Sequence, residues 1–157
     1  MIYLLIGVPG SGKSTYAKKL HADLGIEIIS TDQTRNLHPD WSEDLIWPEV
    51  YRLVAEAVKE DRDVVFDATN ATPKVRARFR SEVEKHNVTP EIVALYFDTP
   101  WEECQRRVIK RNQNPAERYL PPEVVASYGH SIIKPSLEEG FVAIQIIQNG
   151  IVVETIK

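Results

Sequence analysis

The sequence is poor in features that would place it in several large functional classes. Its 157 residues include a single cysteine, Cys104, which excludes an internal disulfide framework and a cysteine-based zinc cluster. It has no run of about 18 apolar residues, so we expect no membrane-spanning helix. The formal net charge is −4, so the chain as a whole is not a general polyanion binder. We therefore predict a cytoplasmic protein in which Cys104 has only a packing role.

What the sequence does contain is a regular alternation of short apolar runs and helical segments. The predicted strands are Ile2–Ile6, Ile26–Ile29, Val64–Phe66, Ile92–Phe97 and Phe141–Ile147. The predicted helices are Lys13–Leu24, Ser42–Lys59, Pro73–Asn87, Pro100–Asn112 and Pro122–Ile133. The runs are nearly continuous in apolar residues, as expected for strands covered on both faces. The pattern predicts an α/β fold with a mostly parallel sheet flanked by helices.

Two further segments have distinct patterns. Asn149-Gly150 stands between the apolar runs Ile144–Ile147 and Ile151–Val153, which predicts a hairpin and an antiparallel last strand. The polar segment Asn112–Pro122 contains three prolines and predicts a mobile loop between two helices, a lid over about residues 112–121. Because we find no linker or internal repeat, we predict a single domain over residues 1–157.

The segment from Gly7 to Ser14 matches the phosphate-loop pattern G-x-x-x-x-G-K-[ST] in full. Glycines allow the backbone N–H groups to surround an anion, Lys13 can reach the β- and γ-phosphates, and the Ser14 hydroxyl can coordinate Mg²⁺. ATP and Mg²⁺ are therefore the expected ligands. The predicted ATP-binding residues are Gly7, Pro9, Gly10, Ser11, Gly12, Lys13, Ser14 and Thr15. Thr15 also breaks the dinucleotide fingerprint G-x-G-x-x-G, which argues against a Rossmann oxidoreductase.

The residues after the second and third strands indicate which kind of phosphate-loop protein this is. The guanine and switch motifs of GTPases, N-K-x-D and D-x-x-G, do not occur, which leaves the small kinases. Asp32 follows the second strand, where a carboxylate can take the proton of an alcohol, so a hydroxyl acceptor is favoured over a phosphate. Arg35 could hold an anionic group of the acceptor. Asp67 ends the third strand as a Walker-B acid would, and with Ser14 forms the predicted metal site.

Basic residues form two further groups. Lys74, Arg76, Arg78 and Arg80 lie within one helix, and a buried stripe of Val75, Phe79 and Val83 would leave them exposed. Such a face is either simply solvated or contacts nucleic acid, and the sequence leaves both open. Arg111 and Arg118 flank and enter the predicted lid, where an arginine can stabilise charge on the γ-phosphate.

At this point the sequence resembles the phage-type 5′-polynucleotide kinases and their P-loop kinase relatives. The resemblance is carried by GVPGSGKST at 7–15, STDQTR at 30–35, FDATNATPKVR at 66–76, YFDTPWEECQRRVIKRN at 96–112 and LPPEVVASY at 120–128. It implies that Lys13 and Ser14 serve ATP and Mg²⁺, that Asp32 is the general base, that Asp67 is an active-site acid and that Arg35 binds the acceptor. It also implies a lid arginine at the γ-phosphate, and Arg118 is preferred over Arg111 because the family's arginine does not align directly.

These assignments define the expected site and its partners. The predicted catalytic residues are Asp32, Lys13, Arg118 and Arg111, and the predicted acceptor-binding residues are Arg35, Asp67, Asn70 and Arg76. The expected partner is the 5′-OH end of DNA or RNA, with any phosphatase or ligase supplied in trans. One alternative is a kinase of a small-molecule or nucleoside alcohol. Another is an ATP-gated binding module without catalysis, against which the intact Lys13 and Asp32 argue.

Overall fold

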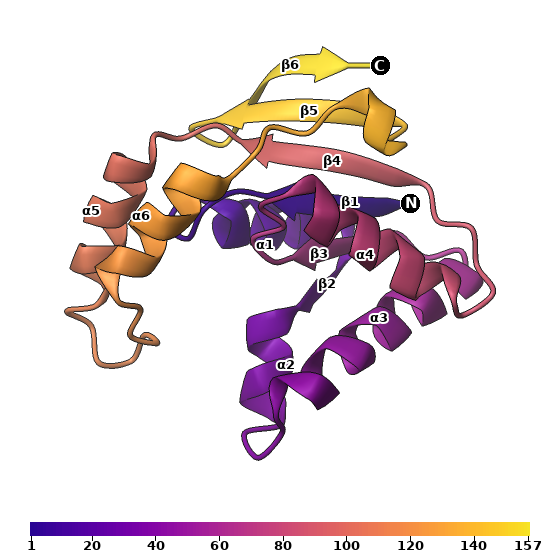
Figure 1. The fold of residues 1–157 in the computed structure, drawn as a ribbon, viewed down its shortest axis with the longest axis horizontal. Helices are drawn as coiled ribbons and strands as arrows, with labels where there is room; N and C mark the ends of the chain where they lie inside the picture. The colour runs from indigo at the N-terminus through magenta and orange to yellow at the C-terminus, as the bar shows by residue number, and fades with distance from the viewer.

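The computed structural model describes residues 1–157 and forms one six-stranded sheet with the strand order β2-β3-β1-β4-β5-β6 (Figure 1). The strands are β1 (Ile2–Ile6), β2 (Glu27–Ser30), β3 (Val64–Asp67), β4 (Ile92–Phe97), β5 (Ala143–Gln148) and β6 (Ile151–Ile156). The first five are parallel to one another, and β6 runs antiparallel to β5. The predicted α/β class with a C-terminal antiparallel hairpin is confirmed.

Six α-helices and one short 3₁₀ helix connect the strands. They are α1 (Lys13–Leu24), α2 (Thr31–Leu37), α3 (Glu43–Lys59), α4 (Pro73–Glu84), α5 (Trp101–Arg111), α6 (Pro122–Ser131) and the 3₁₀ helix η1 (Leu137–Glu139). The five predicted helices are confirmed to within a few residues, but α2 was not predicted. It has seven residues and begins directly after β2, where the Ser30 hydroxyl accepts a hydrogen bond from the Gln33 backbone N–H at 3.1 Å. None of these helices combines the length and apolar character needed to cross a membrane.

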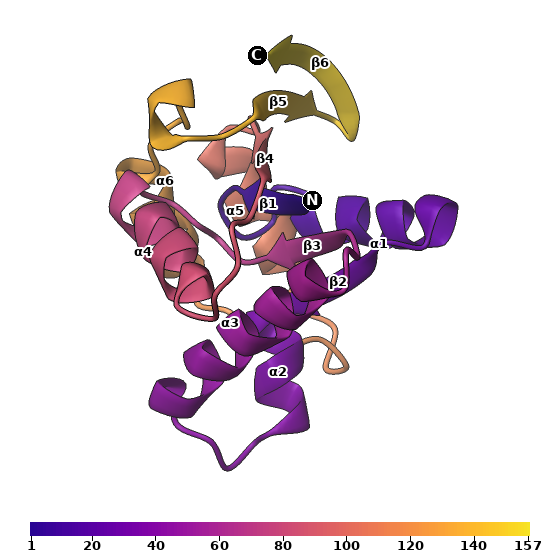
Figure 2. The same cartoon turned by 90° about the vertical axis from the view of Figure 1, so that its right-hand side faces the viewer.

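Alternate residues of the central strands face two separate cores. From β1, Leu4 packs with α3 and α4 through residues such as Val50 and Phe79, whereas Leu5 packs with Ala17 of α1. In Figure 2, α1 accordingly lies on one side of the sheet and α3 and α4 on the other. Burial of each such side chain contributes about 1.5–3 kcal/mol. This packing holds the carboxyl ends of β1, β2 and β3 next to one another, which is where the site forms.

The hairpin turn has the backbone that its sequence predicts. Asn149 and Gly150 have φ values of 51° and 74°, and two successive positive φ angles define a type I′ turn. The strand that follows is an edge strand, and its apolar residues Ile151 and Val153 are exposed. The antiparallel pairing has one register shift, at Ile146 and Ile147 of β5.

The buried face of α4 differs from the prediction. Val75 is 42% exposed, and Arg76, which is 3% exposed, takes its place beside Phe79 and Val83. The Arg76 guanidinium makes a bidentate ion pair with Glu139, with Nε to Oε1 at 2.8 Å and Nη2 to Oε2 at 3.0 Å. Its Nη1 also donates to the carbonyl oxygens of Asn70 at 2.9 Å and Ile133 at 3.1 Å. The Arg76 guanidinium is therefore buried and bonded to the protein itself, and its contact with the acceptor stays a prediction that this environment does not favour.

Replacing Arg76 with methionine should strongly destabilise the fold. The variant removes the Arg76 donor from two carbonyl groups and from the Glu139 carboxylate, which keeps only the Ser136 N–H, and breaking a buried ion pair costs about 3–5 kcal/mol. The free energy of unfolding, measured by urea denaturation, should fall by this amount. Arg78→Met, an exposed change two positions along the same helix, should change it by less than about 0.5 kcal/mol. Equal effects of the two substitutions would contradict the assignment.

Candidate functional site

The phosphate loop joins β1 to α1 and is held against helix α5. Gly10 has a φ of 86°, and a Cβ atom at this position would lie 2.5 Å from the Cys104 carbonyl oxygen, so the close approach of α5 requires glycine. The Arg107 Nη1 donates to the Gly10 carbonyl at 3.2 Å from the same helix. The loop thus has a fixed path before any ligand is bound.

Lys13 begins α1 with its ammonium group turned back into the loop. Its Nζ donates to the Val8 carbonyl oxygen at 3.0 Å. Burial lowers the pKa of Lys13 to about 8, although the nearby Asp67 carboxylate acts in the opposite direction. The Ser11 hydroxyl is also buried and has no hydrogen-bond partner in the protein. A buried cation and an unpaired hydroxyl within a glycine-rich loop fit the oxygens of a nucleotide phosphate.

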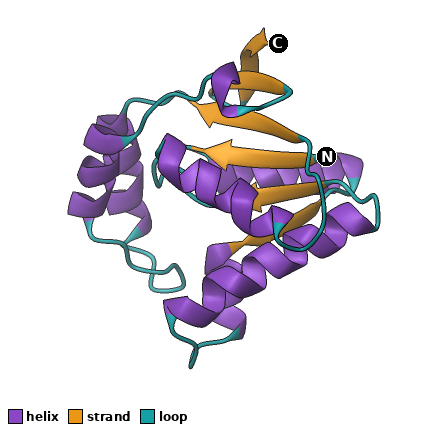
Figure 3. Cartoon of the chain, turned by 45° about the vertical axis from the view of Figure 1, so that its right-hand side comes forward, coloured by secondary structure: helices purple, strands orange, loops and turns teal.

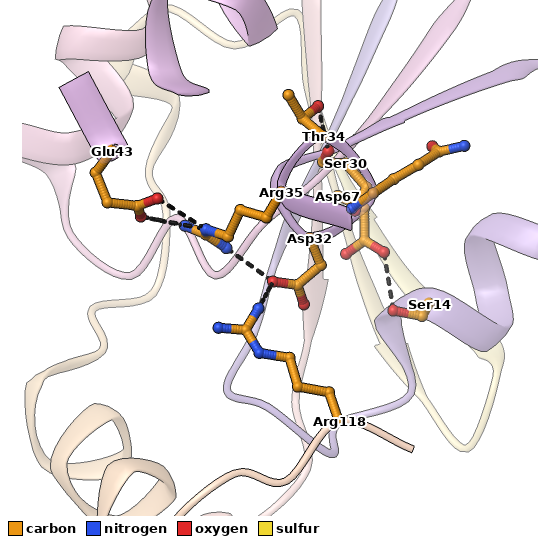
Figure 4. A network of polar contacts seen from close by, with 9 residues as sticks. Ser14, Ser30, Asp32, Thr34, Arg35, Glu43, Asp67 and Arg118 are labelled. Carbon is orange, nitrogen blue, oxygen red and sulfur yellow. Dashed lines mark hydrogen bonds and ion pairs between the residues drawn. The ribbon is translucent and has the colours of Figure 1, made fainter. Parts of the chain in front are cut away.

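Ser14 and Asp67 form the second part of the site. The Ser14 hydroxyl donates to Asp67 Oδ2 at 2.8 Å, which joins the start of α1 to the end of β3 (Figure 4). Burial raises the pKa of Asp67, and the charge of Lys13 and the Ser14 hydrogen bond partly offset this. One hydroxyl and one carboxylate oxygen suit Mg²⁺, which takes few protein ligands and completes its shell with phosphate oxygens and water. These two residues therefore fit the metal site that the sequence predicts.

Asp32 lies in the first turn of α2 and contacts two arginines through one oxygen. Arg35 Nη1 donates to Asp32 Oδ1 at 2.7 Å, and Arg118 Nη1 donates to the same oxygen at 2.8 Å (Figure 4). The Asp32 side chain is 64% exposed, so it is open to a ligand from solvent. Besides the larger effect of burial, the charge of Asp32 raises the pKa of Lys13 and the charge of Arg111 lowers it. The structure therefore gathers Lys13, Asp32, Asp67, Arg35 and Arg118 at one edge of the sheet.

The loop between α5 and α6 carries Arg118 to this edge. In Figure 3 the loop extends from the two helices toward α2, and the Arg118–Asp32 ion pair joins the two regions. The Asn112 side chain closes the base of the loop, donating to the Leu120 carbonyl at 2.7 Å and accepting from the Leu120 N–H at 3.0 Å. Of the two lid candidates, Arg118 is the one that contacts Asp32. Arg111 lies exposed at the end of α5 and forms no ion pair.

The two lid helices also pack on the phosphate loop. Val8 of the loop lies in a small core with Cys104 and Val108 of α5 and Val125 of α6, all of them buried. Burial raises the pKa of the Cys104 thiol, so it remains protonated and inert. The predicted packing role of Cys104 agrees with this environment. A shift of α5 and α6 would thus also move Val8 and the phosphate loop that contains it.

Asn70 supports the phosphate loop from the other side. Its Nδ2 donates to the Leu5 carbonyl at 2.7 Å, and the neighbouring Thr69 carbonyl accepts from the Gly7 N–H at 3.2 Å. Asn70 is 3% exposed, with φ of 49°. The Asn70 side chain is thus buried and supports the end of β1, its Oδ1 has no hydrogen-bond partner in the protein, and its contact with the acceptor stays a prediction.

Glu43 is a residue of the site that the sequence analysis missed. Its carboxylate pairs with Arg35, which donates from Nη2 to Oε1 at 2.6 Å and from Nε to Oε2 at 3.0 Å. The hydrogen bond to Glu43 raises the pKa of Arg35, and the same bond lowers the pKa of Glu43. An acidic residue in the first turn of a helix is ordinary, so the sequence carries no signal that sets Glu43 apart.

The lid assignment gives a direct test by substitution. Arg118→Ala should lower the turnover of phosphoryl transfer by at least about 10²-fold if Arg118, which here donates to Asp32, is the predicted lid donor to the charge that develops on the γ-phosphate. Arg106→Ala, an exposed change on the outer face of α5, should be nearly silent. Steady-state kinetics with saturating ATP would measure both. Small and equal effects would show that the lid arginine is misassigned, and Arg111 would then be the residue to test.

Comparison with known proteins finds one matching family and several similar structures. Residues 2–132 match the family described as "AAA domain". A candidate kinase from Chloroflexus aurantiacus has a similar structure, with TM-score 0.74 and 14% identity over 95% of this chain and 85% of that chain. The structure of Kti12 of Chaetomium thermophilum in complex with ADP-AlF3 has a TM-score of 0.70 and 16% identity, over 95% of this chain and 89% of that chain. A sugar kinase from a Janibacter species has a TM-score of 0.67 and 15% identity, over 94% of this chain and 84% of that chain. A search of curated proteins finds no match. At these identities the structural likeness shows a P-loop kinase-like fold.

Proposed function

The chain belongs to the AAA domain family, and from this premise we propose that it is an ATP- and Mg²⁺-dependent kinase that phosphorylates a hydroxyl group. The observation that carries the proposal is the exposed Asp32 carboxylate, positioned by Arg35 and Arg118 at the sheet edge that also carries Lys13. A phosphate acceptor is already an anion and needs no base. A hydroxyl acceptor does need one, because the alcohol is a poor nucleophile until its proton is removed.

The proposed mechanism assigns one role to each of these groups. Asp32 accepts the proton of the acceptor hydroxyl as its oxygen attacks the γ-phosphorus and the bond to the β-phosphate oxygen breaks. Lys13 and Arg118 donate to the phosphoryl oxygens as charge develops on them. Ser14 and Asp67 would hold Mg²⁺, which when bound supplies charge neutralisation at the β- and γ-phosphates. Arg118 has to exchange its contact with Asp32 for one with the nucleotide, so nucleotide binding removes one of the two arginine donors from Asp32 Oδ1 and leaves the Arg35 donor in place.

Two acceptor classes remain candidates, each supported by a different observation. A small uncharged alcohol is favoured by the Arg35–Glu43 pair, since a carboxylate already occupies the guanidinium, and by a sugar kinase among the structurally similar proteins. The 5′-OH end of DNA or RNA is supported by the adjacency of Asp32 and Arg35 that the resemblance implies. The basic helix gives less support to a nucleic acid than expected. Arg76 is buried and Arg80 donates to the Gly140 carbonyl, so only Lys74 and Arg78 remain unpaired.

A screen of phosphoryl transfer from γ-labelled ATP tests the proposal. The acceptors are 5′-OH DNA, 5′-OH RNA, a panel of nucleosides with their 3′-phosphates, and simple sugars. Transfer to any hydroxyl supports the kinase assignment, and the ratio of kcat/KM values with and without the 3′-phosphate separates the two classes. Tight binding of ATP without transfer to any member would instead favour a non-catalytic ATP-gated module.

A further inference from the structure

The guanidinium of Arg35 is divided between two carboxylates from different elements. Its Nε and Nη2 face Glu43 of α3, and its Nη1 faces Asp32 of α2 (Figure 4). The edge formed by Nε and Nη2 is one of the planar pairs of donors with which arginine binds a phosphate or carboxylate side-on. Glu43 therefore occupies, within the protein, a position that an anionic acceptor group would have to take.

Local structure keeps Glu43 in that position. The residue lies in the first turn of α3, where the helix dipole stabilises a negative charge. The short connection from α2 to α3 is ordered by a stack of the His38 and Trp41 rings, with centroids 3.6 Å apart and planes 9° from parallel. The start of α3 is thus held close to α2, and the Arg35 side chain is only 26% exposed within the pair. An incoming phosphate must displace a bidentate partner that is part of the fold.

We infer that Glu43 determines the acceptor class, by holding the Nε and Nη2 edge of Arg35 so that acceptors without a phosphate beside the reacting hydroxyl are preferred. This inference rests on the proposed function and names its substrate class, an uncharged alcohol. The Glu43 carboxylate is acceptor-only and can take hydrogen bonds from the hydroxyl groups of such a molecule. The carboxylate weakens the binding of a phosphorylated acceptor in two ways, because it occupies the Arg35 guanidinium and because it repels the like charge of the phosphate.

The test measures anion binding at Arg35 without assuming the acceptor. The full-length protein is saturated with Mg²⁺ and a non-hydrolysable ATP analogue, so that the phosphate loop is filled, and inorganic phosphate is then titrated. The dissociation constant and the ¹⁵N–¹H signal of the Arg35 Nε are followed together. Glu43→Gln should bind phosphate about fivefold more tightly than the wild type, the size expected for removing one partly exposed ion pair, and should shift the Arg35 signal. Adding Arg35→Lys to Glu43→Gln should abolish the gain.

A matched control and a kinetic measurement complete the experiment. Glu49→Gln removes a carboxylate of the same helix that pairs with Arg52, and it should leave phosphate affinity unchanged. In transfer assays, Glu43→Gln should raise kcat/KM for adenosine 3′-monophosphate relative to adenosine. The inference is overturned if Glu43→Gln binds phosphate no more tightly than the wild type does. These results leave the proposed function standing, which fails only if the wild type phosphorylates no hydroxyl.

Discussion

Asp32→Ala is expected to lower phosphoryl transfer by about 10²–10⁴-fold while ATP binds with near-normal affinity. The substitution removes the proposed general base, and the contribution of such a base is of this size. The nucleotide site remains whole, because Lys13, Ser14 and Asp67 make their contacts without Asp32. The loss also frees Arg118 from its ion pair, so nucleotide affinity has no reason to fall.

The measurement for Asp32 pairs a single-turnover assay with a nucleotide titration. The turnover assay reports transfer to the acceptor, and the titration reports the dissociation constant of ATP in the same preparation. Asp44→Ala provides the control, because Asp44 is an exposed acid in the first turn of α3. Retention of most of the transfer activity by Asp32→Ala would contradict the general-base assignment.

Lys13→Ala is the second change with a large expected effect, and it acts by a different route. Loss of the ammonium group removes charge stabilisation at the transferring phosphoryl group, so transfer and any slow hydrolysis of ATP should fall together, by about 10²–10³-fold. The fold should persist, because burial lowers the pKa of Lys13 to about 8 and its charge is thus unfavourable in the free protein.

Parallel assays of transfer, ATP hydrolysis and thermal unfolding test the Lys13 prediction. Lys19→Ala, an exposed change on the same helix, should leave all three at wild-type values. A variant that lost transfer but kept hydrolysis would contradict the proposed role, because both reactions develop charge on the same γ-phosphate. A variant that failed to fold would contradict the account of the buried ammonium.

The sequence predicted the parts of the site that depend on local pattern. The phosphate loop and the acids after β2 and β3 lie at strand ends, and the β/α alternation predicts parallel strands whose carboxyl ends share one edge, so Asp32 and Asp67 could be placed at that edge from the sequence. Helix α2 was missed because it is a short polar segment that begins without a connecting loop. Its start depends on one hydroxyl cap at Ser30, a weaker signal than an apolar period.

The parts that the sequence did not predict depend on distant partners. The helical repeat of α4 is compatible with either Val75 or Arg76 on the buried face. Arg76 is buried because it pairs with Glu139, which lies 63 positions along the chain. Asn70 turned inward because the backbone of β1 offers a carbonyl to its amide, 65 positions away. The pairing of Arg35 with Glu43 likewise depends on how α3 leaves α2, which neither residue's local sequence shows.

The chemical bond formed by the transferred phosphate tests the central claim most directly. The protein is incubated with ATP, Mg²⁺ and an acceptor mixture that contains nucleosides, sugars, 5′-OH oligonucleotides and nucleoside monophosphates, and the products are identified by ³¹P NMR and mass spectrometry. The account predicts a phosphate monoester on a hydroxyl oxygen, formed by the wild type and lost in Asp32→Ala. Formation of a diphosphate on the monophosphate acceptors alone, or of free phosphate without any ester, would contradict it.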